Sequence, residues 1–496
     1  MLYTSQNFFL FFPIVCLFYY IIPKKIRWFW ILFISYFFYF SWNQKLPLLL
    51  LFSTIITYIG GIGIQYLKKR DKKPRKFGQK IILFFCISIN IGILFFFKYL
   101  DFFFLNLNKI LNRIHFIQIE NPFSFILPLG ISFYTFKVIS YLMDNYREKI
   151  DAEKNLFKYA AYVAFFPTII SGPIDRAIST IPQITDPKKF GFENVKHGLW
   201  LMLWGYFQKF VIADRLALMV NEVFNNQDLY THSGVIGMIA SIFYSFQIYC
   251  DFSGYSDIAI GAAQVLGFTV SDNFRRPYFA KSIVDFWKRW HISLTTWFRD
   301  YLYIPLGGNR VSKIRHLRNI MIVFIVSGLW HGAGWNFIFW GFLHGIYQII
   351  ENLLTPVFHK KLHNMKTYGT FGFKLAQTLF TFFLVNFAWI FFRSESLEHA
   401  FTFIRGIFRF NPSLLFNANL FTFGMDRTNF EITIFSLIIL FVVNWLQRDQ
   451  TSLRVKIDHQ PLWFRWVLII GCIFFILIYG IYGPSYEVNK FIYSGF

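Results

Sequence analysis

Long apolar runs separated by short polar or basic stretches dominate the chain. A membrane-spanning helix needs about twenty apolar residues, and on that measure the pattern predicts roughly eleven candidate spans, some of them tilted or re-entrant. The resulting fold class is an all-α polytopic membrane protein, which we expect to form one multi-spanning domain over 1–496. The expected spans lie near 7–22, 28–42, 46–67, 81–97, 123–143, 159–170, 195–213, 235–250, 375–392, 432–446 and 463–481.

Helix-breaking residues interrupt two of these spans, 123–143 and 159–170. Broken helices are tolerated at membrane depth where the freed backbone groups find protein or water, so the breaks are consistent with an enclosed cavity. Ordinary kinks in a packed helix bundle would explain them equally well. The breakers are Pro122, Pro128, Gly130, Pro167, Gly172 and Pro173.

Basic residues gather in the short loops between apolar runs. They follow the first run at 24–27 and the third at 68–76, which reads KKRDKKPRK. By the positive-inside rule these two loops are cytosolic, so the N-terminus and the link 43–45 are external. The first apolar run has no basic residues before it, which favours a retained span over a signal peptide. We expect the polar stretch 411–431 to be a loop that could form an external cap.

Composition agrees with a membrane protein and narrows the partners. The 496 residues are 55% hydrophobic, 22% aromatic and 15% charged, with a mean hydropathy of +0.44. The net charge of +23 follows from the basic loops, so it indicates a lipid bilayer with anionic headgroups, and no nucleic acid, as the partner. We therefore expect a multi-pass membrane protein.

Several kinds of chemistry find no support in the sequence. It contains no G-x-S-x-G elbow, P-loop or dinucleotide fingerprint, so hydrolase, ATPase and flavin functions are disfavoured. The cysteines are too scattered for a disulfide framework or a metal cluster, and we expect no metal and no bound cofactor. They are Cys16, Cys86, Cys250 and Cys472.

The stretch 273–319 is too charged to cross a membrane and combines basic with aromatic residues. That mixture is typical of a helix lying at a membrane interface. Helical spacing places Trp287, His291, Leu294 and Phe298 on one face, so we expect His291 to point into the protein. Five of its basic residues are candidates to bind the phosphates of a phosphorylated cytosolic substrate: Arg275, Arg276, Lys288, Arg289 and Arg299.

The stretch 320–350 is apolar enough to lie in a bilayer, yet it carries His331 within WHGAGWNF. An imidazole buried in hydrocarbon without a partner is costly, so such a group usually faces a bundle interior or a water-filled cavity. The glycines around it permit a close approach of backbone or ligand, or simply close helix packing. We interpret His331 as the chemical centre.

Other polar residues near these stretches receive structural interpretations. Gly341, His344, Gly345 and Gln348 share one stripe of a helix and are expected to form a packing face. Among the acidic residues, Asp214 adjoins Arg215 and Asp300 adjoins Arg299, and we expect structural ion pairs there. Asp251 and Asp257 are candidates to line a polar entrance.

Long ordered motifs resemble one known family. The blocks YCDFSGYSDIAIG, DFWKRWHISLTTWFRDYLYIPLGGNR and SGLWHGAGWNFIFWGFLHG are similar to the membrane-bound O-acyltransferase (MBOAT) superfamily, in particular its bacterial alginate O-acetylase-like branch. The resemblance covers most of the chain. It implies tilted helices around a central cavity, with interfacial or re-entrant helices, and two characteristic histidines that fall on His291 and His331, the latter catalytic.

The resemblance also implies a reaction. We expect an O-acetyltransferase that uses acetyl-CoA, with His331 as general base or acyl-carrying nucleophile, because a neutral imidazole accepts a proton. His291 would orient the donor or polarise its carbonyl, and Asn336 would hydrogen-bond the oxyanion. The expected partners are a separate periplasmic acetyltransferase and a surface polysaccharide, alginate-like or peptidoglycan. Two alternatives remain: D-alanyl transfer from a carrier-protein thioester to teichoic acid, and a transporter or channel.

Overall fold

All regular secondary structure in the described part of the chain is helical, which confirms the predicted class. The computed structural model describes residues 1–70, 76–115, 118–123, 127–226, 234–362, 368–409, 419–447 and 453–482. Within these ranges the chain packs into two compact units. One comprises 1–199 and 259–272, and the other comprises 200–258 and the residues from 273 onward. Both units contain helices that the hydropathy pattern anticipated.

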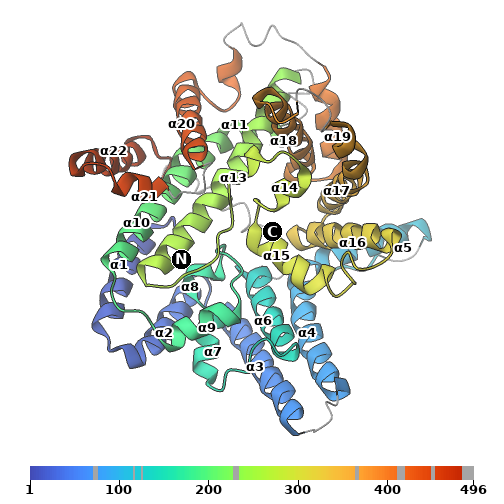
Figure 1. Cartoon of the computed structure of the whole chain (residues 1–496). Coiled ribbons are helices and arrows are strands. Elements are labelled where there is room, and N and C mark those ends of the chain that lie inside the picture. Colours follow the sequence, from blue (N-terminus) through green and yellow to red (C-terminus); the bar gives the residue numbers. More distant parts are fainter. Residues whose placement is uncertain are drawn as a thin grey trace. The chain divides into compact units, whose positions relative to one another are not determined.

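The first unit is built from helices near the N-terminus. Three of them, α3, α4 and α6, lie side by side (Figure 1). The buried Lys137 ammonium of this unit donates to the carbonyl oxygen of Tyr162 at 2.9 Å. The main helices are α1 (Gln6–Ile21), α2 (Arg27–Phe40), α3 (Leu46–Arg70), α4 (Lys76–Lys98), α5 (Leu100–Arg113), α6 (Ile131–Tyr146), α7 (Leu156–Val163), α8 (Phe166–Ile169), α9 (Ala177–Thr185) and the first part of α10 (Phe192–Tyr206).

The second unit carries the two histidines singled out in the sequence. Long helices alternate with short helical pieces in this unit. In chain order its helical elements are the π-helical η2 (Phe207–Ala213), α11 (Asp214–Asn225), most of α13 (Gly234–Val265), η3 (Pro277–Phe279), α14 (Ile283–Trp287), α15 (Ile292–Phe298), η4 (Arg299–Tyr303), α16 (Lys313–His331), α17 (Trp335–Leu362), α18 (Phe371–Arg393), α19 (Leu397–Ile407), η6 (Asn419–Thr422), α20 (Arg427–Leu446), α21 (Leu453–Asp458) and α22 (Leu462–Tyr479).

Six described helices are long and apolar enough to cross a membrane: α3, α4, α13, α18, α20 and α22. Their surroundings differ, since 78% of the most apolar window of α13 is buried and only 6% of that of α22. An apolar helix surface left uncovered by protein suits contact with lipid chains. The sixteen-residue α1 is apolar but shorter.

Several predicted spans proved to be broken or misplaced. The span 159–170 divides into α7 and α8, whereas 195–213 continues without a break from α10 into the π-helical η2. The span 235–250 is part of the 32-residue α13, which continues through the block DFSGYSDIAIG. Of the predicted loop 411–431, residues 411–418 lie outside the described residues, while 427–431 already belong to α20. Hydropathy located the apolar stretches but could not locate helix ends, which depend on backbone pairing.

Candidate active site

His331 is the last residue of α16, at a break between two helices. The next residue, Gly332, is extended with φ −162° and ψ 153°, and α17 begins at Trp335. The uninterrupted hydropathy of the stretch 320–350 would suit a single helix. The stretch instead forms parts of two helices, α16 and α17, that meet just after His331. His331 is 2% exposed, which confirms that it points into the protein.

Glycines allow the two helices to approach each other closely. A Cβ atom on Gly328 would overlap the carbonyl oxygen of Phe337, and one on Gly341 would overlap that of Phe324. Side chains at these positions would force α16 and α17 apart. Gly328 and Gly341 therefore serve helix packing, one of the two roles that the sequence permitted for glycines in this stretch.

Aromatic rings surround His331 on several sides. The ring centroid lies 4.8 Å from that of Trp330, 5.0 Å from that of Trp340 and 5.3 Å from that of Phe392, all in edge-to-face geometry. Such rings exclude bulk water and lower the local dielectric, which strengthens any electrostatic interaction made inside.

His291 occupies the turn between α14 and α15, in a left-handed backbone conformation with φ 42° and ψ 55°. The predicted continuous helix face through Trp287, His291, Leu294 and Phe298 is thus wrong, because the helix breaks after Trp287 and restarts at Ile292. All four side chains are nevertheless buried, and His291 is 0% exposed, so its predicted inward orientation is confirmed. This burial lowers the pKa of His291 to about 3 by desolvation.

One aromatic cluster brings the two histidines together. Trp330 contacts both rings, with centroid distances of 6.1 Å to His291 and 4.8 Å to His331. Phe252, from the motif-bearing part of α13, meets the His291 ring edge to face at 4.6 Å. Segments from α13, the α14–α15 turn and the α16–α17 break therefore form a single site.

Asn273 organises the turn that carries His291, and the sequence analysis did not find it. Its backbone carbonyl oxygen accepts a hydrogen bond from the backbone N–H of Ile292 at 2.9 Å. Its side-chain Oδ1 lies 2.6 Å from Ser293 Oγ and 3.3 Å from His291 Nδ1. Its Nδ2 donates to Ser256 Oγ on α13 at 3.0 Å. The only sequence signal was an amide at the head of a basic, aromatic stretch.

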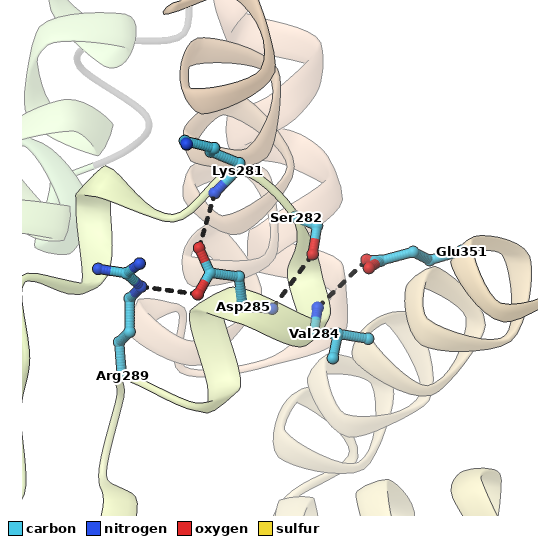
Figure 2. A network of polar contacts seen from close by, with 6 residues as sticks. All are labelled: Lys281, Ser282, Val284, Asp285, Arg289 and Glu351. Carbon is cyan, nitrogen blue, oxygen red and sulfur yellow. Dashed lines mark hydrogen bonds and ion pairs between the residues drawn. The ribbon is translucent and has the colours of Figure 1, made fainter. Parts of the chain in front are cut away.

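A capping network anchors α14 and hence the turn beyond it. Ser282 Oγ accepts from the backbone N–H of Asp285 at 3.1 Å, and Asp285 accepts in turn from the backbone N–H of Lys281 at 3.1 Å. Figure 2 shows Glu351 reaching from α17 to the first turn of α14, where it accepts from the backbone N–H of Val284 at 3.2 Å. The contacts to Asp285 and Val284 satisfy N–H groups that a helix start leaves unpaired.

His344 joins the same assembly, although the sequence suggested only a packing stripe. It is fully buried on α17, and its Nδ1 accepts a hydrogen bond from the Trp287 indole at 3.3 Å. The ring of Trp340 contacts both histidines edge to face, with centroid distances of 5.0 Å to His344 and 5.0 Å to His331. His344 therefore ties α14 to α17.

The basic candidates for phosphate binding differ in how they are engaged. Arg289 Nε contacts Asp285 at 2.8 Å and Arg299 Nε contacts Asp300 at 2.9 Å, which confirms the pair expected at Asp300. Arg276 Nη1 donates to the carbonyl oxygen of Asn444 at 3.4 Å. The side chains of Arg275 and Lys288 are exposed.

Asn336 is placed differently from the expected oxyanion donor. It is 3% exposed, and its Nδ2 donates to the carbonyl oxygens of Ser394 at 2.8 Å and Phe391 at 3.4 Å. Both amide hydrogens are thus directed at the C-terminal end of α18, where helix carbonyls lack partners. This geometry argues against the expected role and favours a structural one.

A buried ion cluster joins η2, the first residue of α11 and α13, and its cation was also missed. Lys209 Nζ is 2.8 Å from Asp214 and 2.7 Å from Asp251, with all three side chains nearly inaccessible. The expected pair of Asp214 with Arg215 is therefore wrong, because the Arg215 guanidinium instead donates to Asn429 at 3.0 Å. Adjacency in the sequence suggested Arg215 as the cation beside Asp214, whereas that cation is Lys209.

Comparison with known proteins agrees with this architecture. Residues 148–394, which include both histidines, match the model of the MBOAT, membrane-bound O-acyltransferase family. The chain belongs to this family, and it is accordingly a multi-pass membrane protein and an acyltransferase.

Individual relatives cover most of the chain. It is 37% identical to the peptidoglycan O-acetyltransferase of Helicobacter pylori over 412 residues, which is 77% of this chain and 74% of the relative. It is 36% identical to the probable alginate O-acetylase AlgI of Pseudomonas aeruginosa over 423 residues, 84% of this chain and 77% of the relative. Identity to the teichoic acid D-alanyltransferase of Bacillus subtilis is 31% over 243 residues, 47% of this chain and 60% of that protein.

Proposed function

We propose that this protein is an O-acetyltransferase of the bacterial inner membrane. It takes an acetyl group from cytosolic acetyl-CoA and passes it across the membrane for O-acetylation of a cell-surface polysaccharide, either an alginate-like exopolysaccharide or peptidoglycan. The observation that carries the proposal is the position of His331 at a helix break inside an aromatic enclosure that also holds His291. The names of the two acetylating relatives support acetyl as the acyl group.

His331 would act as a general base in this reaction. The acceptor hydroxyl gives its proton to the imidazole while its oxygen bonds to the acetyl carbonyl carbon. The carbon–sulfur bond then breaks, and the departing thiolate takes the proton from the imidazolium, which yields the ester and free CoA and restores His331. Positioned bases of this kind contribute roughly 10²–10⁴ in rate.

The end of α16 favours this proton transfer. His331 lies at the C-terminus of a nineteen-residue helix, where the helix dipole is negative. That end stabilises a nearby cation by about 0.3–1 kcal/mol, so the transient imidazolium is favoured over one placed elsewhere in the enclosure. The alternative, attack by His331 itself on the thioester, would leave a covalent acetyl-imidazole that radiolabelled acetyl-CoA can trap.

The proposed reaction needs acetyl-CoA as the acyl donor and a periplasmic acetyltransferase as the partner. Exposed Arg275 and Lys288 are suited to contact the phosphates of acetyl-CoA if this surface is cytosolic. A separate periplasmic acetyltransferase would receive the group and place it on the polysaccharide. Transfer of D-alanine from a carrier-protein thioester to teichoic acid is the second candidate, supported by the Bacillus subtilis relative.

The test compares two histidines of the same helix. His331→Ala should abolish acetylation of the surface glycan and thioester turnover by the purified protein, with membrane abundance unchanged. His316→Ala, near the opposite end of α16, is the matched control and should retain both. Wild-type acetylation by His331→Ala would overturn the proposal. Turnover of a D-alanyl carrier thioester but not of acetyl-CoA would replace it with the second candidate.

A further inference from the structure

Asn273 is the polar neighbour of His291 whose chemistry can be assigned. Its Oδ1 lies 3.4 Å from the backbone N–H of Ser293. A backbone N–H can only donate, so the amide atom that faces it must be the oxygen. This fixes the orientation of the side-chain amide and agrees with Nδ2 donating to Ser256 Oγ at 3.0 Å.

The amide orientation in turn fixes the proton on the imidazole. Asn273 Oδ1 is an acceptor, and His291 Nδ1 lies 3.3 Å from it. Two acceptors cannot form a hydrogen bond, so Nδ1 must carry the hydrogen. In a neutral imidazole the other nitrogen, Nε2, then holds a lone pair, and the complete burial of the ring favours that neutral form.

We propose that Asn273 is a positioning residue that holds His291 in the Nδ1–H tautomer, so that Nε2 presents a hydrogen-bond acceptor to the substrate. This rests on the proposed acetyl transfer. It also refines the role of His291. An Nε2 lone pair cannot donate to a thioester carbonyl or an oxyanion, so His291 would instead accept a hydrogen bond from an N–H or O–H of a substrate. The pantetheine amides of the donor and the acceptor hydroxyl both offer such groups.

Non-local contacts support the assignment. Asn273 reaches His291 and Ser293 from 18 and 20 residues away and is itself held by Ser256 on α13. The adjacent backbone bond from Arg275 N–H to the Arg289 carbonyl, 2.9 Å, keeps the two segments in register. Asn273 is 1% exposed, so solvent does not compete for its amide.

A double-mutant cycle separates positioning from a merely structural role. Asn273→Ala should lower kcat by roughly 10- to 100-fold, whereas in a His291→Ala background the same change should have no further effect. Asn273→Asp, which keeps an acceptor facing Nδ1, should recover most of the lost kcat, and the apolar isostere Asn273→Leu should not. Asn90→Ala, at a buried asparagine in the other unit, controls for the general cost of losing a buried amide.

The tautomer can also be read directly. In the full-length protein labelled with 15N-histidine, the signals lost in His291→Ala should show a protonated Nδ1 and an unprotonated Nε2. The inference would be overturned if Asn273→Ala lowered kcat by the same factor with and without His291→Ala, or if Nδ1 proved unprotonated. The proposed acetyl transfer would still stand in that case, provided that His331→Ala is inactive. If Asn273→Ala does not accumulate in the membrane, the kcat of Asn273→Asp and the 15N spectrum of the full-length protein still test the positioning role of Asn273. If the wild-type protein turns over no thioester, the proposed function itself fails.

Discussion

The indole N–H of Trp287 donates a hydrogen bond to Nδ1 of His344 across 3.3 Å, joining residues 57 apart in sequence. Trp287 closes α14, four residues before His291, and His344 lies on the helix that begins just after the His331 break. This bond and the Glu351 contact at the other end of α14 together fix the His291 turn against α17.

Removing the indole donor should weaken both the fold and the site. Trp287→Phe keeps an aromatic ring but leaves Nδ1 of the buried His344 without its donor, which we expect to cost about 1–3 kcal/mol of stability. Thermal unfolding in detergent and thioester turnover measure the two effects. Trp463→Phe, at an exposed position on α22, is the control and should alter neither. An unchanged Tm in Trp287→Phe would show that the bond contributes nothing.

Loss of the buried cation should be severe. Lys209→Met leaves the carboxylates of Asp214 and Asp251 buried without their ammonium, and breaking a buried pair in this way typically costs about 3–5 kcal/mol. Membrane abundance and Tm should fall sharply. Lys313→Met, at an exposed lysine that opens α16, should leave both unchanged.

A charge-neutral combination tests the reason for that loss. Adding Asp214→Asn and Asp251→Asn to Lys209→Met should restore part of the Tm, because the uncompensated charges are gone. If the triple variant is no more stable than Lys209→Met, lost packing and not buried charge explains the defect.

The contact between α16 and α17 should not tolerate a single added methyl group. Gly328→Ala would press a Cβ into the carbonyl oxygen of Phe337, and overpacking of this kind costs about 1–3 kcal/mol. Since the same contact sets the position of His331, turnover should fall together with Tm. Gly372→Ala, where a Cβ meets no atom within 4 Å, is the matched control and should be neutral or slightly stabilising. Equal behaviour of the two variants would refute the close contact.

Burial of His291 predicts a loss of stability in acid. Its pKa is about 3 in the folded protein, against about 6.5 for an unfolded histidine. Between these values the unfolded chain binds the extra proton, so stability falls as the pH drops from 6.5 towards 3, by about 2 kcal/mol at pH 5, and is unaffected above pH 7. Tm measured between pH 7.5 and 5 should decline less steeply in His291→Asn than in the wild type. Parallel curves would contradict the prediction.

The sequence predicted the helical class, the inward direction of both histidines and the basic stretch beside them, because these follow from hydropathy and motif. Hydropathy could not show that the 320–350 stretch breaks at His331, since the residues on both sides of the break are equally apolar. The sequence paired Asp214 with its immediate neighbour, whereas the buried partner is Lys209. It also missed Asn273, whose importance comes from contacts made 17 to 20 residues away. Local patterns carry no information about such pairings.

The left-handed backbone conformation of His291 lowers thermal stability at a position whose imidazole is needed for the proposed catalysis. An L-residue other than glycine pays roughly 1–2 kcal/mol to adopt that conformation, and asparagine tolerates it better than histidine does. A screen of position 291 for heat resistance alone would therefore favour glycine or asparagine and select variants without the imidazole. Engineering this protein for stability must leave residue 291 untouched and look for gains elsewhere.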